Sequence, residues 1–344
     1  MEQWLTELWY RERAQLPLLQ PLASLYGAAL ALRRRAYAAG WLRTVAAGRP
    51  VVVVGNLTVG GTGKTPLTAW LARALSAQGL RVGIVSRGYG GRHGGKARRV
   101  EASSQWREVG DEPLILARAS SCPVMVGSDR VAAARALAAS VDVIVADDGL
   151  QHLRLARNCQ IVVIDGARGF GNGRLLPAGP LREPLACLGQ ADAVVVNGRP
   201  EHATLAAAAP VPGALAMTLV PQEVVRLDGH AAPRRLEAFR GQRVHGVAGI
   251  GNPARFFAEL RAHGLEVIAH AFPDHHALRP AELAFGDGLP VLMTEKDAVK
   301  CPSLGDPRLW YVPVTAQLPA DDARALLARV LAKVRGGAPA GGRL

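Results

Sequence analysis

The chain has 344 residues, which at roughly 150 residues per domain suggests about two domains. Hydrophobic residues make up 49% and aromatic residues 5% of the chain, a composition that is typical of layered α/β proteins and excludes a disordered chain. Lys and Arg outnumber Asp and Glu by 41 to 28, so an anionic partner is expected unless the charge simply reflects an Arg-rich proteome.

Residues 1–48 differ from the rest of the chain and are predicted to form a helical segment at a membrane surface. Their mostly apolar stretch, 16–32, lies at the lower length limit for crossing a bilayer, and Pro21 interrupts it. Trp and Tyr residues flank the stretch, as they do at membrane interfaces, and the arginines at 33–35 suit anionic headgroups. An ordinary helix packed on the neighbouring domain is the alternative.

Residues 49–212 alternate short β-branched runs with helical patterns. Strands separated by helices imply right-handed βαβ units, and therefore a three-layer α/β/α domain with a mainly parallel sheet. The predicted strands are 50–54, 80–86, 123–126, 141–146, 160–164 and 193–196, and the predicted helices are 66–79, 111–119 and 130–140.

The second half of the chain is predicted to form a smaller domain of the same class. Residues 213–242 are expected to be an extended linker region, 243–334 a smaller α/β domain, and 335–344 a disordered tail rich in Gly and Pro. Within 243–334, the predicted strands are 243–248, 265–270, 290–293 and 309–313, and the predicted helices are 253–263, 280–286 and 320–334.

A glycine-rich loop at 55–66, with the sequence GNLTVGGTGKTP, follows the first predicted strand and precedes the first predicted helix. This is the context of a P-loop, in which glycines let backbone N–H groups wrap around the β-phosphate of a nucleotide at a helix N-terminus. Lys64 is expected to reach the β- and γ-phosphates, and the Thr65 hydroxyl to ligate Mg²⁺. Thr58 stands where the usual first glycine would be, and the other glycines are expected to compensate. The predicted nucleotide-binding residues of the loop are Thr58, Gly60, Gly61, Thr62, Gly63, Lys64 and Thr65.

The predicted strand at 141–146 ends in two acidic residues, Asp147 and Asp148. A carboxylate at the C-terminal end of a parallel strand beside a P-loop can hold Mg²⁺ directly or through water. Asp147 is the better candidate for the metal shell and Asp148 for a neighbouring role. A merely polar strand end is the alternative.

Further polar residues follow other predicted strands and are expected to gather at the same sheet edge. Phosphorylation of a hydroxyl group requires a proton acceptor and cations near the γ-phosphate. Asp111 and His275 are the available base candidates, although Asp111 alone is equally well explained as a helix cap. Lys64, Arg87 and Arg182 are the candidate cations.

Eight motifs in this chain carry a family resemblance from about Trp4 to Leu331. They are TVGGTGKTP, SRGYGG, VGDEP, DDGLQH, NGRLLPAGPLREP, VAGIGNPARFF, FPDHH and TEKDAVK. Together they resemble the tetraacyldisaccharide 4'-kinase family, the lipid A kinases of Gram-negative bacteria. The joint pattern is far more specific than the P-loop alone.

The resemblance implies transfer of the ATP γ-phosphate to the 4'-hydroxyl of a tetraacylated glucosamine disaccharide 1-phosphate, with Mg²⁺ as a cofactor. It also implies a monotopic enzyme on the cytoplasmic face of the inner membrane. The active site would lie in a cleft between two α/β domains that are joined by a two-stranded linker. A monomer is the default expectation.

The resemblance also assigns roles to individual residues of this chain. It implies that Asp111 is the general base and that a histidine of the second domain orients it, His275 rather than His276. Lys64 and Thr65 take the P-loop roles. The remaining pairs are Asp147 and Asp148 near Mg²⁺, and Arg182 and Glu183 close to the nucleotide.

Two other functions are considered. A P-loop GTPase or metal-cofactor chaperone is suggested by TEKD at 294–297, which resembles the guanine-binding motif [NT]KxD, but the spacing is wrong. A membrane-surface protein that binds ATP without transferring it would not need the base candidates Asp111 and His275.

No nucleic-acid partner is expected, because the chain lacks interleaved aromatic and basic residues and zinc-finger spacing. Four cysteines without a CxxC pair indicate reduced thiols in the cytosol.

Overall fold

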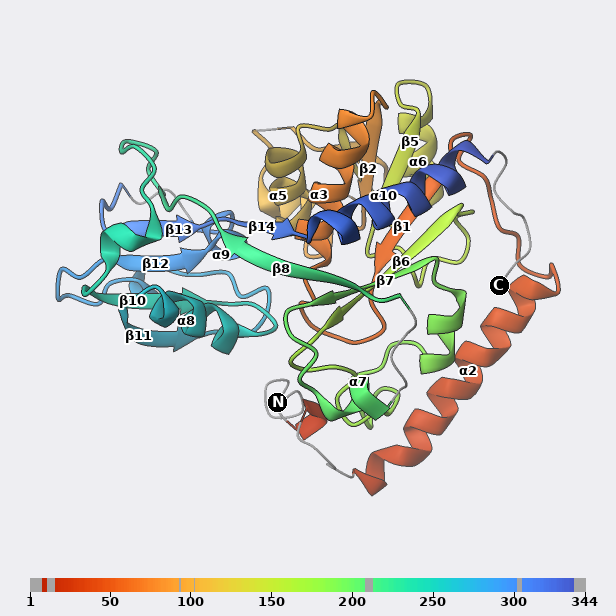
Figure 1. Ribbon diagram of the computed structural model, residues 1–344, viewed down its shortest axis with the longest axis horizontal. Helices are drawn as coiled ribbons and strands as arrows, with labels where there is room; N and C mark the ends of the chain where they lie inside the picture. The colour runs from red at the N-terminus through yellow and green to blue at the C-terminus, as the bar shows by residue number, and fades with distance from the viewer. Residues whose placement is uncertain are drawn as a thin grey trace.

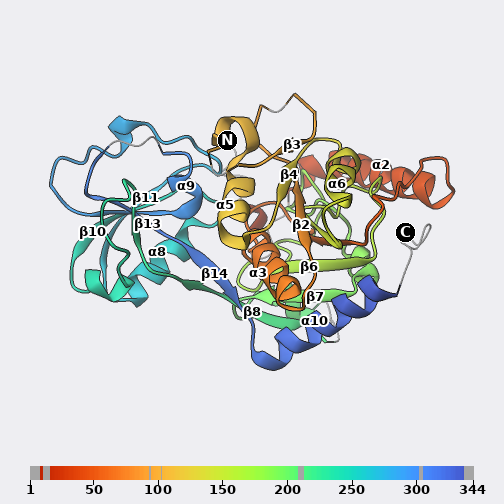
Figure 2. The same cartoon turned by 90° about the horizontal axis from the view of Figure 1, so that it is seen from above.

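Two α/β domains lie side by side in the computed structural model, and a pair of antiparallel strands, β8 (Leu215–Pro221) and β14 (Val314–Gln317), runs between them (Figure 1, Figure 2). The structure describes residues 8–10, 16–92, 94–101, 103–207, 213–301 and 305–336. Most of the predicted tail at 335–344 therefore lies outside the described residues.

The sheet of the first domain is mainly parallel, as predicted. Within the described residues it contains nine strands in the order β14-β8-β7-β6-β1-β5-β2-β4-β3. β1 (Val51–Gly55) lies in the middle, and all of its residues are buried, as expected for a strand covered on both faces. Only β3 and β14, at the two edges of the described sheet, pair antiparallel. The remaining strands are β2 (Val82–Ser86), β3 (Arg98–Arg99), β4 (Val124–Val126), β5 (Val143–Asp147), β6 (Cys159–Asp165) and β7 (Ala193–Asn197).

Helices cover both faces of this sheet. One face carries α3 (Lys64–Ala77), α5 (Asp111–Ser120) and α10 (Ala320–Arg335), and the other carries α6 (Arg130–Ala138). Every fourth position of α3 places a leucine in the core, because positions four apart lie on one side of a helix. Shorter helices are α4 (Trp106–Val109), η2 (Leu185–Gln190) and α7 (Ala203–Ala207).

The second domain is built on a five-stranded sheet within the described residues, in the order β11-β10-β12-β13-β9. Its strands are β9 (Val225–Arg226), β10 (Arg243–Ala248), β11 (Glu266–Ala271), β12 (Val291–Thr294) and β13 (Leu309–Val312). The helices of this domain are η3 (Leu236–Phe239), α8 (Pro253–Ala262), η4 (Pro280–Glu282) and α9 (Glu295–Ala298). The predicted second α/β domain is thus present.

The domain boundaries differ from those expected. The sequence predicts a second domain over 243–334, but α10 returns to the first domain and buries Leu326, Val330 and Val334 in the core that α3 also lines. The apolar spacing predicts this helix. The domain on which it packs depends on the position of the preceding strand β14, which belongs to the first sheet. Within the predicted linker 213–242, β8 belongs to the first sheet and β9 to the second.

The helix predicted at 280–286 is wrong. Only the single 3-10 turn η4 forms there. Gly286 has a φ of 79°, a left-handed conformation that a right-handed helix cannot include.

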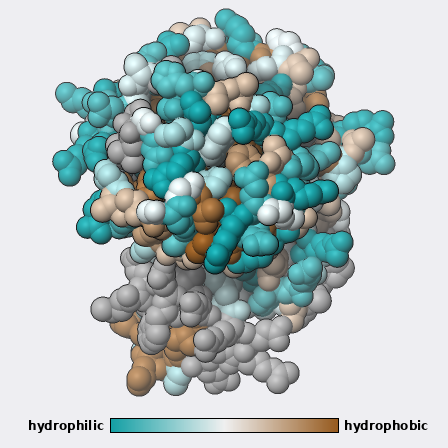
Figure 3. Space-filling model, turned by 90° about the vertical axis from the view of Figure 1, so that its left-hand side faces the viewer, coloured by the Kyte–Doolittle hydropathy of each residue, from teal (hydrophilic) through white to brown (hydrophobic). Residues whose placement is uncertain are grey.

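The N-terminal segment contains η1 (Pro17–Leu19) and the long helix α2 (Gln20–Ala38), as the predicted helical segment requires. One side of α2 contacts the first domain, where the Tyr26 hydroxyl donates to the Arg182 carbonyl over 3.0 Å. The other side exposes leucines, and apolar residues gather where α2 begins, at the lower end of Figure 3. None of the helices in the described part of the chain combines the length and apolar character that crossing a membrane requires.

Candidate active site

The loop between β1 and α3 has the backbone geometry of a phosphate-binding loop. Gly60 and Gly63 have φ values of 91° and 94°, a left-handed conformation that favours glycine. α3 begins at Lys64, so the positive end of its dipole lies at the loop. Thr58, at the position of the usual first glycine, is buried and forms a β-bridge with Leu181.

Asn56, which is not among the predicted site residues, holds this loop together. Its buried side-chain amide donates to the carbonyl of Thr58 over 2.8 Å, and its Oδ1 accepts from Lys64 Nζ over 3.1 Å. The ammonium group of Lys64 also lies 3.7 Å from Asp148 Oδ1. Asn56 therefore fixes both the curvature of the loop and the position of its lysine.

The two acidic residues at the end of β5 point in different directions. Asp147 is fully buried and its Oδ1 accepts from the Thr68 hydroxyl of α3 over 3.0 Å. Burial and the charge of Glu112 raise the pKa of Asp147 to about 7. Burial also acts on Asp148, but the charges of Lys64 and Arg182 outweigh it and lower the pKa of Asp148 to about 2. The pKa values of these two consecutive carboxyl groups are thus shifted in opposite directions.

The oxygen atoms at this position fit a divalent cation that also binds phosphate. The second oxygen of Asp147, Oδ2, is buried and has no hydrogen-bond partner among the described residues. Thr65, on the first turn of α3, lines the same pocket as Lys64. Mg²⁺ prefers a few such oxygen ligands together with phosphate oxygens and water. The described residues contain no group of three or more His, Cys, Asp or Glu side chains that could hold a metal alone.

Arg182 and Glu183 are adjacent in sequence but contact different parts of the protein. The guanidinium of Arg182 donates to both carboxylate oxygens of Asp148, over 3.2 and 3.1 Å, at the mouth of the loop. Glu183 is buried and pairs instead with Arg34 of α2 over 3.3 Å. The structure therefore brings Arg182 to the predicted nucleotide site and directs Glu183 toward the N-terminal helix.

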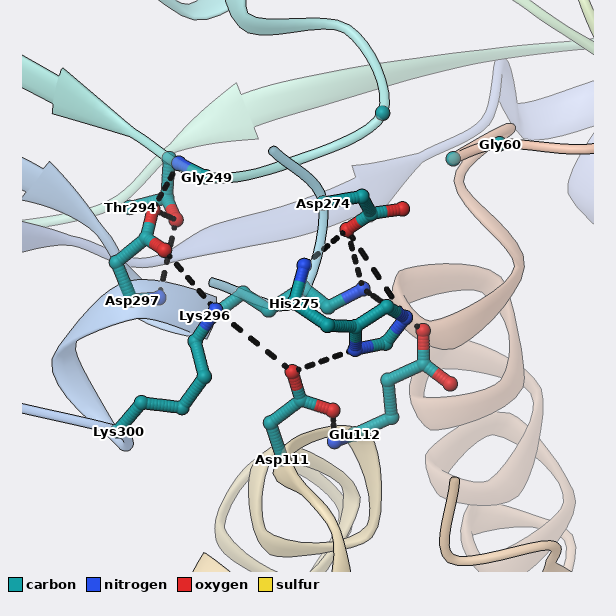
Figure 4. Close-up of polar contacts among 12 residues, drawn as sticks. Gly60, Asp111, Glu112, Gly249, Asp274, His275, Thr294, Lys296, Asp297 and Lys300 are labelled. Atoms are coloured by element: carbon teal, nitrogen blue, oxygen red, sulfur yellow. Dashed lines mark hydrogen bonds and ion pairs between the residues drawn. The ribbon is translucent and has the colours of Figure 1, made fainter. Parts of the chain in front are cut away.

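Asp111 and His275 meet across the gap between the domains (Figure 4). Asp111 is the first residue of α5 and is buried, and its Oδ2 lies 3.0 Å from His275 Nδ1. His275 follows β11 in the second domain, and its ring packs on Tyr89 with the centroids 4.7 Å apart. The adjacent His276 pairs with Glu282 over 3.1 Å. Of the two histidines, it is His275 that contacts Asp111.

Lys296 determines the direction of the hydrogen bond between them. Its ammonium group lies 3.3 Å from His275 Nε2 and 3.2 Å from a carboxylate oxygen of Glu112 (Figure 4). Burial would lower the pKa of Lys296, but the charges of Glu112 and Asp274 outweigh it and raise that pKa. An ammonium group can only donate, so His275 Nε2 accepts and its Nδ1–H donates to Asp111. His275 therefore holds one oxygen of the Asp111 carboxylate in place.

Lys296 and a second lysine, Lys300, favour the ionised form of Asp111. Burial alone would raise the pKa of Asp111, but the hydrogen bond from His275 and the charges of Lys296 and Lys300 outweigh it and lower the pKa below its usual value. Lys300 lies 4.0 Å from Asp111 Oδ2 and pairs with Asp297 over 3.1 Å. Both lysines belong to the motif TEKDAVK, and their spacing of four residues places them on one side of α9 and the turn after it. That spacing was the signal from which they could have been predicted.

Arg130 is a further residue without a predicted role. It is buried at the first position of α6, and burial together with the nearby Arg87 lowers its pKa to about 10, although Asp148 and Asp147 act in the opposite direction. A second arginine therefore lies close to the acidic pair, beside the candidate cation Arg87. A buried arginine at a helix start has no distinctive sequence signal.

A pocket of about 520 Å³ lies between the domains and joins these parts. Its walls come from the phosphate-binding loop, from α5 and from the second domain. Gly61, Thr62, Gly63, Lys64, Thr65, Glu112 and Lys296 line it. The loop and the neighbours of Asp111 therefore face one shared space.

Comparisons with known proteins agree with this arrangement. The family model of the tetraacyldisaccharide-1-P 4'-kinases (LpxK) matches residues 15–334. A tetraacyldisaccharide 4'-kinase of Alkalilimnicola ehrlichii is 56% identical over 300 residues, covering 87% of this chain and 88% of the relative. One of Xanthomonas oryzae pv. oryzae is 51% identical over 317 residues, covering 91% of each chain. A crystal structure described as the "apo" form of LpxK from Aquifex aeolicus in complex with ATP has a TM-score of 0.72 at 27% identity. It covers 92% of this chain and 98% of its own.

Replacing Asn56 by Ala should weaken nucleotide binding by about 10–100-fold, because a charge-assisted hydrogen bond to Lys64 and a bond that shapes the loop are both lost. Isothermal titration calorimetry with ATP and Mg²⁺ measures the change. Gln242→Ala is the control, since this amide also donates to a backbone carbonyl but lies in the second domain. An unchanged dissociation constant in Asn56→Ala would contradict the role given to this residue.

Proposed function

This chain belongs to the tetraacyldisaccharide 4'-kinase family, and on that premise we propose that it transfers the γ-phosphate of ATP to the 4'-hydroxyl of a tetraacyldisaccharide 1-phosphate in lipid A biosynthesis. The observation that carries the proposal is the pairing of Asp111 with His275 beside a phosphate-binding loop. A nucleotide-binding protein without transferase activity has no use for an oriented, ionised carboxylate at that position.

In the proposed reaction, Asp111 accepts the proton of the sugar hydroxyl as its oxygen attacks the γ-phosphorus. The bond between that phosphorus and the β–γ bridging oxygen breaks, and ADP leaves. Lys64 and Arg182 supply positive charge near the transferred group. Thr65, Asp147 and Asp148 would hold Mg²⁺, which supplies charge neutralisation on the phosphate oxygens when bound. His275 bonds Oδ2 of Asp111 over 3.0 Å and the Glu112 backbone N–H donates to Oδ1 over 2.8 Å, so both oxygens of the carboxylate are fixed in direction.

The GTPase alternative lacks support in the geometry of TEKD. The Thr294 hydroxyl donates to Asp297 over 2.6 Å, and Asp297 also accepts from the Gly249 amide over 2.9 Å. Lys300 neutralises the same carboxylate. These residues cap α9 and connect it to a neighbouring loop, and Asp297 is fully buried, so its carboxylate is not exposed to a guanine base.

We also propose that α2 lies on the membrane in which the glycolipid resides. Leu18, Leu25 and Leu32 are 91%, 68% and 63% exposed, and Trp41 is 78% exposed. On α2, Leu22, Leu25 and Leu32 share one side, because they are three and seven residues apart. The opposite side holds the buried Ala23 and Arg34, which pairs with Glu183 of the first domain. An apolar stripe of this kind fits the interfacial region of a bilayer, and nearby arginines fit anionic headgroups.

A position of α2 on the membrane also fits the partner and the location that we propose for the chain. Its partner would be the glycolipid at the cytoplasmic face of the bacterial inner membrane, with the chain bound peripherally as a monomer. A surface-bound enzyme would meet a four-chain lipid without extracting it fully into water.

The first prediction from the proposed function concerns the base. In Asp111→Asn, turnover should fall by about 10²–10⁴-fold, because the amide cannot accept the proton. The dissociation constant for ATP should change little, since Asp111 is not part of the phosphate-binding loop. The assay follows labelled phosphate from ATP into a lipid A disaccharide precursor, and Asp321→Asn, on the exposed start of α10, is the control. Turnover near the wild-type level would rule out Asp111 as the base.

The second prediction concerns pH. Lys296→Met removes a charge that lowers the pKa of Asp111, so the carboxylate should become protonated at a higher pH. The acidic limb of the kcat/KM profile should therefore move to higher pH, with activity lost earlier as the pH falls. Lys333→Met, whose partner Asp192 lies in the first domain, should leave the limb in place. A limb that stays in place in Lys296→Met as well would show that another group controls it.

The third prediction concerns the membrane. The double substitution Leu18→Glu and Leu25→Glu should reduce binding to phosphatidylglycerol-containing vesicles at least about tenfold, since each exposed leucine contributes roughly 1.5–3 kcal/mol when buried. Cosedimentation measures binding, and Ala328→Glu with Ala332→Glu on α10 adds the same charge at exposed positions away from α2. Turnover of detergent-dispersed substrate should be similar in both. Equal vesicle binding by the two double variants would exclude the proposed contact.

A further inference from the structure

The outer side of the phosphate-binding loop is held by two side chains from neighbouring strands of the first domain. Asn197, the last residue of β7, donates from Nδ2 to the Thr62 carbonyl over 3.0 Å. Arg168, in the turn after β6, donates from Nη2 to the Gly61 carbonyl over 2.5 Å. A peptide carbonyl and the N–H group of the same peptide plane point in opposite directions. Bonds that fix these carbonyls outward therefore fix the N–H groups of the next residues inward, toward a bound phosphate.

Both side chains are also bonded to the second domain. Asn197 Oδ1 accepts from Arg255 Nη2 of α8 over 2.9 Å. Arg168 Nη1 donates to the Gly251 carbonyl over 2.9 Å. Two separate bridges therefore run from the second domain, through one residue each, to consecutive peptide groups of the loop.

The packing around the bridges leaves little freedom. Asn197 is 1% exposed, and a Cβ atom added at Gly63 would lie 2.6 Å from its Nδ2. A Cβ atom added at Gly251 would lie 2.5 Å from the backbone nitrogen of Gly61. Backbone of the second domain is therefore in direct contact with the loop.

We infer that Asn197 and Arg168 are positioning residues through which the second domain sets the affinity of the loop for a nucleoside triphosphate. With the domains in the arrangement seen here, Arg255 and Gly251 hold the two side chains against the loop carbonyls. The loop amides are then oriented for phosphate before the nucleotide binds. When the bridges are broken, Asn197 and Arg168 can adopt other rotamers and the loop loses that orientation.

The proposed function supplies only the identity of the nucleotide for this inference, and the phosphoryl-transfer assay on the wild-type chain tests that function separately. Binding is measured here by titration calorimetry of the full chain with ATP and Mg²⁺. Asn197→Ala and Arg255→Met should each raise the dissociation constant about tenfold or more, whereas kcat at saturating ATP should fall by less than about threefold. Arg255→Lys should recover part of the affinity.

Arg255 also lines the interdomain pocket, so a direct contact with the nucleotide has to be distinguished from an effect through Asn197. The double variant Asn197→Ala with Arg255→Met makes the distinction. If Arg255 acts through Asn197, the double variant should bind ATP about as weakly as the weaker single variant. If the two losses multiply, Arg255 acts on the nucleotide directly and the inference is overturned.

Gly251→Ala tests the domain contact without changing either bridging side chain. Its backbone conformation tolerates alanine, so the only conflict is with the loop, and ATP binding should weaken about tenfold or more. Gly189→Ala, where an added Cβ meets nothing within 4 Å, is the matched control and should bind ATP as the wild type does. Chemical denaturation of each variant accompanies the titrations. Wild-type affinity in both Arg255→Met and Gly251→Ala would show that the bridges are packing contacts only.

Discussion

The hydrogen bond between Asp111 and His275 is the interaction on which the arrangement of this protein depends, because its two partners belong to different domains. Asp111 starts a helix that is fixed on the large sheet, and His275 lies in a loop of the smaller domain. A base oriented by a residue of its own domain would be complete in every domain arrangement, including those that admit water. A base completed across a gap is complete only when the gap is narrow, and a narrow gap excludes the water that would otherwise hydrolyse ATP.

Electrostatics reinforces the same dependence. A carboxylate near a triphosphate experiences repulsion that favours its protonated form, and burial acts in the same direction. Lys296 and Lys300 oppose both effects at Asp111, and both come from the second domain. On the opposite side of the loop, Arg182 and Lys64 of the first domain keep Asp148 ionised. The acidic pair proposed to hold Mg²⁺ is therefore prepared within one domain, whereas the proposed base requires residues of two.

The sequence predicted those parts of the site that depend on local structure. The phosphate-binding loop and the acidic end of β5 could each be predicted, because each depends on a pattern of strand, turn or helix residues within a short stretch of the chain. The family resemblance supplied the choice of His275 over His276, and the geometry places His275 against Asp111. The pattern could not supply the packing of α10 on the first domain, since an apolar stripe shows that a helix packs but not on what. It also did not reveal Asn56, because an asparagine that shapes a loop from within looks like any turn residue. The family resemblance places Arg182 and Glu183 together near the nucleotide, whereas in this structure Glu183 pairs with Arg34 and Arg182 with Asp148.

The way the second domain is attached explains why so few contacts can control the site. The chain leaves the first sheet through β8 and returns through β14, and α10 fixes the returning strand in the core. Apart from this strand pair, the described polar contacts between the domains include those of Asp111 with His275, Glu112 with Lys296, Asn197 with Arg255 and Arg168 with Gly251. Each of these four involves Asp111, the residue next to it, or a side chain bonded to the phosphate-binding loop. Contacts that hold two domains together and also shape a ligand site couple the association of the domains to the binding of the ligand. A ligand that favours the shaped site must therefore favour the joined domains by the same free energy. In this protein the domain arrangement seen here and the orientation of the site residues are therefore coupled through the same contacts.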